Sequence, residues 1–436
     1  MEQSSIIISV IDREHFKNEM SLKIRISRGI FFRKVCFTSL VLTVVLLFTA
    51  VCSNTAMAQK AISIDELSAQ YKARQNSLLE SFKMKDYKTS EKLVNELIAL
   101  FNQLSEEDQE AYKDFQGGNY YNLTCIYSQQ KQKKAAVDAF KKAVKYGYID
   151  YSHAKIDTDL DNIRQEKQFI TLMDSIREKF DYPYILRKAG KYQQTDTIGL
   201  PHFTYESATS SNLKQVKDFF KLDSIVGQGD EISKIINLLT WVHKNIRHDG
   251  NNTAVSELDA IDVYNYYKST GKGVNCRDLA ITLNEMYLAM GFKSRYVTCG
   301  SKDNSEVHVI NSVYSNTLNK WLWIDPTCNA YWKDENGNLL SIEEVRERFI
   351  DDRPLILNDD ANWNNEVEKN KENYLVEWMS KLLYWLECTA NSSFNVESRY
   401  RNTNQTYIRL APLDYELPKT RYKVSMTHDA AYFWEH

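Results

Sequence analysis

The stretch that decides the fold reads GKGVNCRDLAITLNEMYLAMG and spans residues 271–291. After Cys276 its apolar residues recur at intervals of three and four, which predicts a helix that ends at Gly291. Cys276 therefore stands at a helix N-terminus, where the helix dipole and backbone amides favour a thiolate and are able to hold a developing oxyanion. The competing interpretation is a small buried hydrophobe, which is the commoner fate of a cysteine.

Two strands are predicted downstream of this helix. Residues 306–314 and 321–324 are rich in strand-forming side chains, and the polar residues between them form turns. We expect a β-hairpin centred midway between His308 and Asp325, so that an antiparallel pairing sets these two residues side by side. The carboxylate would then orient the imidazole, and the imidazole would take the proton of Cys276 if the helix docks against the hairpin.

These segments resemble the core of the transglutaminase-like superfamily, whose fold is related to that of papain. The matching strings fall within residues 232–334, and they are GVNCRDLA at 273–280, GFKSRYV at 291–297, HV at 308–309 and WLWIDPT at 321–327. The resemblance implies a catalytic triad of Cys276, His308 and Asp325, with none of the three positions substituted. It also implies an α+β domain in which a cysteine at a helix start faces an antiparallel sheet.

The resemblance further implies acyl chemistry at a carbonyl, with a thioester intermediate that is released to water or to an amine. Bacterial members of the superfamily are more often hydrolases of peptide or amide bonds, and this chain shows no sign of the β-sandwich domains of the animal cross-linking enzymes. We therefore expect a thiol hydrolase that acts on a peptide or protein substrate. Two alternatives stay open: an acyl transferase to amines, and a protein-binding scaffold with an unused thiol site.

Upstream, residues 65–179 carry apolar side chains at helical spacing with few breakers, which predicts an α-helical region. Its clearest piece is a helix pair at 120–145, where the small residues Ala136 and Ala143 flank Phe140 and allow close packing. This pair resembles one unit of a tetratricopeptide repeat. The functional interpretation is a concave surface that binds a protein partner; the alternative is a helical domain that packs on the catalytic one.

These patterns divide the chain into four parts: a signal peptide at 1–58, an α-helical, tetratricopeptide-like domain at 59–187, a transglutaminase-like domain at 188–350 and a C-terminal extension at 351–436. We expect the extension to pack on the catalytic domain. Towards this end of the chain, helices are expected at 341–349 and 373–388, and strands at 407–410 and 422–426.

Other residues with metal-binding chemistry do not form a convincing site. Residues 231–246 predict an amphipathic helix, and we interpret His243 and His248, on or beside it, as structural or surface residues because no further ligands surround them at metal-site spacing. Cys299 and Cys328 bracket the hairpin but lack a Cys-x-x-Cys element, so a disulfide or two buried thiols is expected. The sequence predicts no metal and no cofactor.

The N-terminus has the order of a secretory signal. Arg33 and Lys34 precede an apolar run at 35–51, and Ala-Met-Ala at 56–58 provides a cleavage site after Ala58. An uncleaved anchor is the alternative, although the run is shorter than the roughly 20 apolar residues that span a bilayer. We expect an exported protein, periplasmic or extracellular, that meets the membrane only through this segment.

Composition narrows the choice of partners. The 436 residues include 55 basic and 58 acidic ones, with a net charge of -3. No basic run interleaved with aromatic residues would track a phosphate backbone, so nucleic acid is not an expected partner. The 43% of hydrophobic residues supply more than one core. Two of the seven cysteines lie in the signal, and the odd number left implies at least one unpaired thiol in an oxidising compartment.

Overall fold

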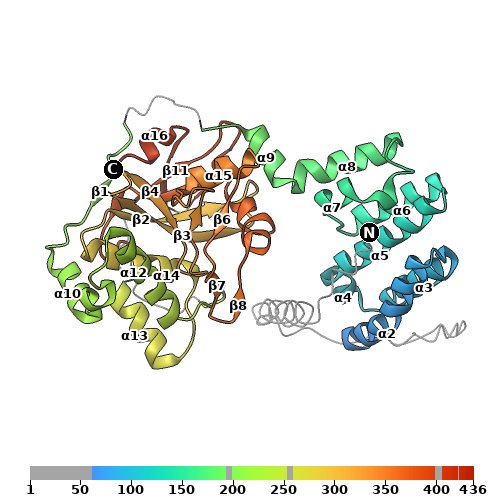
Figure 1. Ribbon diagram of the computed structural model, residues 1–436, viewed down its shortest axis with the longest axis horizontal. Coiled ribbons are helices and arrows are strands. Elements are labelled where there is room, and N and C mark those ends of the chain that lie inside the picture. Colours follow the sequence, from blue (N-terminus) through green and yellow to red (C-terminus); the bar gives the residue numbers. More distant parts are fainter. Residues whose placement is uncertain (1–60, 193–198, 253–258, 398–404, 421) are drawn as a thin grey trace, which may run out of the picture. The chain divides into compact units, whose positions relative to one another are not determined.

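The computed structural model describes residues 61–192, 199–252, 259–397, 405–420 and 422–436 (Figure 1). The expected signal peptide at 1–58 lies outside these ranges. The chain divides into two compact units between Asp181 and Tyr182. A helical unit followed by an α+β unit confirms the predicted fold class. No helix in the described ranges combines the length and the apolar character that crossing a membrane requires.

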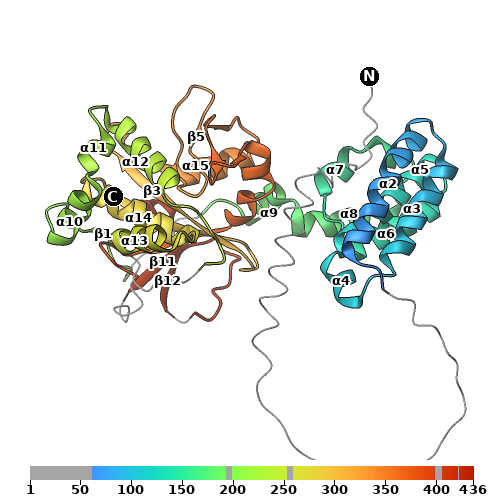
Figure 2. The ribbon, with the colours of Figure 1, turned by 90° about the horizontal axis from the view of Figure 1, so that it is seen from below.

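The first unit is an array of α-helices (Figure 2): α2 (Ile64–Lys83), α3 (Tyr87–Phe101), α4 (Glu106–Ala111), α5 (Lys113–Gln129), α6 (Lys133–Lys145), α7 (Tyr151–Ile156) and α8 (Lys167–Phe180), with the 3-10 turn η2 (Thr158–Leu160) before α8. Helices α5 and α6 form the expected pair. Ala136, Phe140 and Ala143 on α6 are fully buried, as their alternation of small and large side chains predicted. The tetratricopeptide-like identity of this unit stays a prediction.

The second unit is built on a six-stranded sheet of order β12-β11-β9-β2-β3-β4. Its strands are β2 (Ser294–Gly300), β3 (Val307–Ser315), β4 (Lys320–Ile324), β9 (Trp385–Thr389), β11 (Thr406–Leu410) and β12 (Lys423–Thr427). Neighbouring strands are antiparallel except the edge pair β11 and β12, which is parallel. Half of the sheet thus comes from residues 351–436, so this segment is built into the domain.

Helices cover both faces of the sheet (Figure 1). One face carries α10 (Ser211–Phe220), α11 (Leu222–Val226), α12 (Glu231–Asn245), α13 (Ala260–Thr270) and α14 (Cys276–Ala289). The other carries α9 (Tyr182–Ala189), α15 (Ile342–Ile350) and α16 (Ala430–Phe433). Side chains of β3 alternate between the two cores, with Val309 and Val313 on the α14 side and Ile310 on the α15 side. Because α9 belongs to this unit, the division falls slightly before residue 188.

Short two-stranded ladders complete the domain: β1 (Thr204–Tyr205) with β10 (Asn391–Ser392), β5 (Trp332–Lys333) with β6 (Ile356–Leu357), and β7 (Asn362–Trp363) with β8 (Val367–Glu368). The helix expected at 341–349 and the strands expected near the C-terminus are confirmed as α15, β11 and β12. The helix expected at 373–388 is wrong. This segment forms the π-helical turn η3 (Lys371–Val376), the 3-10 turn η4 (Met379–Leu382) and strand β9, which is buried on both faces and therefore shows no alternation.

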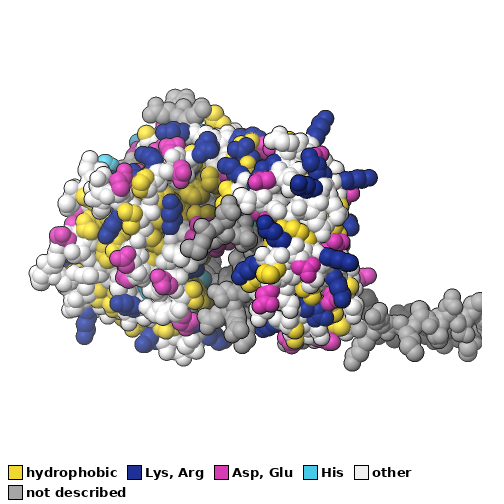
Figure 3. Space-filling model, turned by 45° about the vertical axis from the view of Figure 1, so that its right-hand side comes forward, with side chains coloured by type: hydrophobic (Ala, Val, Ile, Leu, Met, Phe, Trp, Pro, Cys, Tyr) yellow, Lys and Arg dark blue, Asp and Glu magenta, His cyan; other side chains and the backbone are white. Residues whose placement is uncertain are grey.

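One face of the molecule carries side chains of both charges. On the face that Figure 3 presents, Lys and Arg side chains intermingle with Asp and Glu. Ion pairs join some of these neighbours, such as Lys133 with Glu166 at 2.9 Å and Lys302 with Asp414 at 3.1 Å. Exposed pairs of this kind contribute about 0–1 kcal/mol each, so the stability of the fold depends mainly on its buried cores.

Candidate active site

Cys276 is the first residue of α14, as the sequence predicted. The side-chain oxygen of Asn275 accepts hydrogen bonds from the backbone amides of Arg277 (2.9 Å) and Asp278 (3.1 Å), and Asp278 accepts one from the amide of Asn275 (3.4 Å). This capping box fixes where the helix begins. It also corrects one expectation, because the amides of Arg277 and Asp278 bind the cap and do not point at the thiol.

Helix α14 is held across strand β3. Asn311 on β3 donates from Nδ2 to the carbonyl oxygen of Ala280, one turn after Cys276, at 2.8 Å. The backbone N–H of Val309 donates to the Cys276 sulfur. The docking that the sequence could only assume therefore brings the thiol beside the strand position of His308.

His308 and Asp325 meet as expected, but through a different register. His308 Nε2 lies 3.0 Å from Asp325 Oδ2, and both side chains are buried. Strands β3 and β4 pair Asn311 with Ile324, so His308 faces a position two residues beyond Asp325. The predicted direct pairing is wrong because the turn between β3 and β4, residues 316–319, is centred one residue further along the chain than assumed, and it ends at Asn319 in a left-handed conformation with φ 52°. A shift of two residues keeps both side chains on one face, which preserves their contact.

Asp325 is a buried carboxylate with three hydrogen-bond donors. Oδ2 accepts from His308 and from the hydroxyl of Tyr374 at 2.6 Å, and Oδ1 accepts from the amide of Thr327 at 2.8 Å. Burial raises the pKa of Asp325, but the charge of His308 and these hydrogen bonds outweigh it and lower the pKa below its ordinary value. Asp325 is therefore ionised at neutral pH and holds the ring of His308.

The thiol and the imidazole shift each other's protonation. Burial lowers the pKa of His308, but the charge and hydrogen bond of Asp325, with the contact to Cys276, raise it to about 10. Burial raises the pKa of Cys276, but hydrogen bonds from His248 and His308, the charge of His308 and the amide of Val309 lower it to about 5. Between these two values the pair is a thiolate beside an imidazolium. Because Nε2 binds Asp325, Nδ1 is the nitrogen left for the sulfur.

Aromatic side chains from η3 and from the turn between η3 and η4 cover the imidazole and the carboxylate. The ring of Trp378 lies 4.6 Å from that of His308, and its Nε1 donates to Glu306 at 2.8 Å. Tyr374 stacks on Trp332 with ring centroids 6.0 Å apart. Sequence reasoning missed Tyr374 and Trp378, for which the only signal was the aromatic richness of the C-terminal segment.

His248 is a second correction, because it was interpreted as a structural or surface residue. Its half-buried side chain hydrogen-bonds to the thiol of Cys276. His243 does have a structural environment, since it is buried with Nδ1 3.1 Å from the carbonyl oxygen of Pro326 and Nε2 2.9 Å from Asn362 Oδ1. A single histidine beyond the end of a helix gives no pattern by which His248 could have been found.

The remaining described cysteines have a different environment. Cys125, Cys299, Cys328 and Cys388 are buried free thiols, which excludes the disulfide considered for Cys299 and Cys328. Burial raises the pKa of each, that of Cys388 to about 12. Among the described cysteines, a lowered thiol pKa is therefore peculiar to Cys276.

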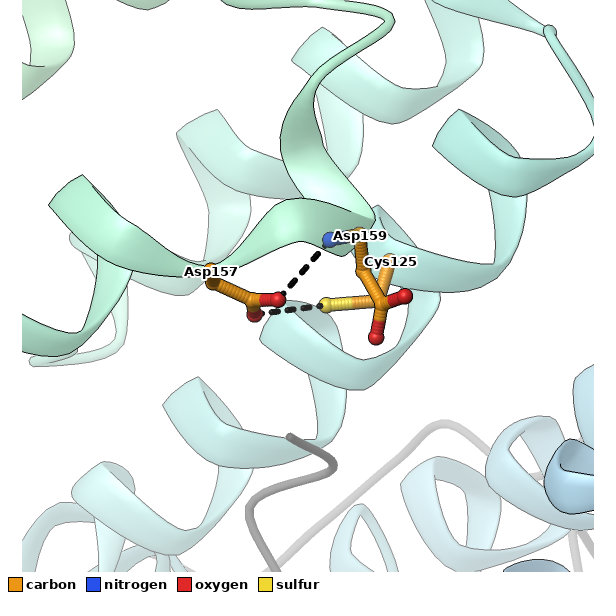
Figure 4. A group of neighbouring side chains, drawn as sticks. All are labelled: Cys125, Asp157 and Asp159. Atoms are coloured by element: carbon orange, nitrogen blue, oxygen red, sulfur yellow. Dashed lines mark hydrogen bonds between the residues drawn. The ribbon is translucent and has the colours of Figure 1, made fainter. Parts of the chain in front are cut away.

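A second group of titratable side chains lies in the first unit, where Cys125, Asp157 and Asp159 place ligand atoms within 4.8 Å of one another (Figure 4). Asp157 accepts from the amide of Asp159 at 2.9 Å, which starts η2, and from Tyr121 at 2.7 Å and the Cys125 thiol at 3.6 Å. Burial, with neighbouring carboxylates, raises the pKa of Asp159 to about 6. These hydrogen bonds account for the proximity of Cys125, Asp157 and Asp159.

Parts of this chain are similar to known proteins. Residues 221–326 match the family model of the transglutaminase-like superfamily. A stretch of 60 residues is 37% identical to a chloroplastic protein of Arabidopsis thaliana, and it spans 14% of this chain and 18% of that protein. The crystal structure of a candidate cysteine protease from Cytophaga hutchinsonii aligns with 50% of this chain and 58% of its own, at 18% identity and a TM-score of 0.22.

Proposed function

We propose that this chain, whose residues 221–326 match the family model of the transglutaminase-like superfamily, is a cysteine-dependent enzyme that hydrolyses peptide or amide bonds. One observation carries the proposal: the Cys276 thiol is hydrogen-bonded to His308, which lies 3.0 Å from the buried carboxylate of Asp325. A nucleophile, a base and a group that orients the base are the parts that acyl transfer through a covalent intermediate requires. In this proposal these roles belong to Cys276, His308 and Asp325.

The first half of the reaction forms a thioester. The thiolate of Cys276 attacks the carbonyl carbon, a C–S bond forms, and the π electrons of the carbonyl move to its oxygen. When the tetrahedral intermediate collapses, the C–N bond breaks and the leaving nitrogen takes the proton from Nδ1 of His308. Asp325 keeps the ring oriented and stabilises the imidazolium until that proton is transferred.

The second half regenerates the thiolate. Neutral His308 takes a proton from water as the water oxygen attacks the thioester carbon. Collapse breaks the C–S bond, releases the carboxylic acid and restores the thiolate beside the imidazolium. An amine in place of water would give a new amide by the same steps, so the acceptor decides between hydrolysis and transfer.

The test is incubation of the full chain with a mixture of peptides, with and without an added primary amine, followed by mass spectrometry. We expect new carboxyl groups, a hydroxylamine-sensitive acyl adduct on Cys276, and loss of both in Cys276→Ala. Cys125→Ala is the matched control, since it removes a thiol from the other unit and should retain turnover. Amine adducts in place of hydrolysis would assign acyl transfer, and an inert Cys276 in a folded protein would leave the scaffold interpretation.

The proposal includes export. The residues that support it are the basic pair Arg33 and Lys34, the apolar run that follows and the small residues before Gln59. Expression in a bacterial host, fractionation and N-terminal sequencing test it. A chain that begins at Gln59 outside the cytoplasm is the expected result, whereas a full-length chain in the cytoplasm would contradict export.

A further inference from the structure

The segment that carries His248 runs along the loop that leads into Cys276. His248 and Val274 form an isolated parallel β-bridge. The backbone amide of Asp249 donates to the carbonyl oxygen of Val274 at 2.7 Å, and the amide of Val274 donates to the carbonyl oxygen of Arg247 at 2.9 Å. Gly273 makes this approach sterically feasible, because a Cβ there would lie 2.9 Å from the Arg247 carbonyl oxygen and 2.8 Å from the Cβ of Asp249. Two backbone hydrogen bonds therefore fix His248 beside the active-site loop.

The β7–β8 hairpin holds the other side of His248. The backbone amide of His248 donates to Asn364 Oδ1 at 2.8 Å, and its carbonyl oxygen accepts from Asn364 Nδ2 at 3.1 Å. The indole Nε1 of Trp363 lies 3.0 Å from His248 Nδ1. An indole N–H can only donate, so Nδ1 is the acceptor and the proton of the neutral ring resides on Nε2. The hydrogen bond between His248 and Cys276 is therefore one in which Nε2–H donates to sulfur.

We propose that His248 is a second catalytic imidazole of this site, which donates from Nε2–H first to the Cys276 thiolate and then to the carbonyl oxygen in the tetrahedral intermediate. The inference rests on the proposed function. In the step concerned, the thiolate electron pair forms the C–S bond and the carbonyl π pair moves to oxygen. His248 keeps its proton and supplies a hydrogen bond, while His308 gives its own proton to the leaving nitrogen.

The capping of α14 occupies two backbone amides that could otherwise serve as such donors. The amides of Arg277 and Asp278, which would otherwise face a developing oxyanion, donate to Asn275. In the tetrahedral intermediate the carbonyl carbon is bonded to the Cys276 sulfur, and the oxygen is bonded to that carbon. The oxygen is therefore close enough to accept a hydrogen bond from a group that already donates to the sulfur. A donor held in place before the reaction stabilises the new charge without reorganisation, and loss of one such donor typically lowers kcat about 10²–10³-fold.

The first test measures the rate of Cys276 alkylation by iodoacetamide against pH in the full chain, and it needs no substrate. His248→Ala should move the inflection upward by about one to two pH units, which corresponds to one hydrogen bond to a charged group. His248→Gln, whose amide can donate, should show a smaller shift. Trp363→Phe should also raise the inflection, because Nδ1 loses the donor that fixes the tautomer. His202→Ala, at an exposed histidine, is the control and should match the parent.

The second test reads the tautomer directly. Nitrogen-15 spectra of the histidine-labelled protein should show His248 protonated at Nε2, with a change of tautomer in Trp363→Phe. An unchanged alkylation inflection in folded His248→Ala, or a proton on Nδ1 in the parent, would overturn the inference. If His248→Ala does not fold, Trp363→Phe decides by the same measurement.

The two proposals fail in different ways. A parent protein in which Cys276 is reactive only at alkaline pH would refute the thiolate and hence the proposed function. If Cys276 of the parent is reactive at mildly acidic pH but the inflection is the same in His248→Ala, only the proposed role of His248 is refuted. With a substrate in hand, His248→Ala should lose about 10²–10³-fold in kcat even at a pH where alkylation shows the thiolate fully formed.

Discussion

Removal of the Tyr374 hydroxyl should lower the free energy of unfolding but leave the ionisation of the Cys276 thiol unchanged. Tyr374→Phe deletes the 2.6 Å hydrogen bond to Asp325, and Trp323 Nε1, 3.3 Å from the same hydroxyl, loses its acceptor. The ring remains stacked on Trp332. A hydrogen bond to a buried charge contributes about 1.5–3 kcal/mol, and a buried donor left without a partner adds to the loss, so the expected cost is about 2–4 kcal/mol in the free energy of unfolding.

The ionisation of the Cys276 thiol should not change with this loss of stability. With one donor fewer, the carboxylate of Asp325 holds the proton of His308 at least as firmly, so the alkylation inflection of Cys276 should stay near its parent value of about 5. Folding lowers the pKa of Asp325 below 3.8, so its stabilising contribution is present above that pH and is lost as the pH falls through the folded pKa. The difference in unfolding free energy between Tyr374→Phe and the parent should therefore become smaller in acid, and the part that comes from Trp323 should remain.

The assay is denaturant unfolding followed by tryptophan fluorescence, together with alkylation of Cys276 across pH. Tyr384→Phe is a matched control, because its hydroxyl also donates at 2.6 Å to a carboxylate, that of Asp414, whose side chain is 50% exposed. Water can replace that bond, so we expect a loss of about 1 kcal/mol or less. Equal losses in the two variants would refute the reasoning, as would an upward shift of the Cys276 inflection by a pH unit in Tyr374→Phe.

Three further predictions concern the same site. The plot of kcat/KM against pH should be bell-shaped, rising through about 5 as Cys276 ionises and falling through about 10 as His308 loses its proton, and a single limb would contradict the ion pair. Asp325→Asn removes the charge that raises the pKa of His308, so alkylation of Cys276 at neutral pH should slow about tenfold or more, whereas parent-like rates would exclude this role. Gly273→Ala places a Cβ 2.9 Å from backbone atoms, so it should cost about 1–3 kcal/mol in unfolding free energy. It should also raise the pH inflection of Cys276 alkylation by displacing His248. An unchanged unfolding free energy would contradict this packing.

Local sequence was sufficient for the parts of the site that lie within one element. The apolar period after Cys276 locates the helix start, and two segments rich in strand-forming residues locate the hairpin of His308 and Asp325. The exact register was not accessible, because it depends on the length of the turn and on Asn319 adopting a left-handed conformation. The error of two residues did not affect the predicted contact between His308 and Asp325, because side chains two residues apart on a strand point to the same face.

The parts that local sequence could not supply are those placed by tertiary packing. His248 reaches Cys276 through a bridge to Val274, and its tautomer depends on Trp363 from a hairpin far along the chain. Strand β9 was taken for a helix, because an apolar run buried on both faces has neither the period of a surface helix nor that of a surface strand.

The order of the sheet has a consequence for how the protein is made. Strand β9 lies between β11 and β2, so strands that are synthesised after the whole triad complete the sheet on one side of β2, its earliest strand. Tyr374 and Trp378, which cover Asp325 and His308, are also synthesised after every member of the triad. Long sequence separations of this kind make folding slow. A growing chain therefore carries its nucleophile long before it carries the strands and aromatic side chains that complete the folded domain around it.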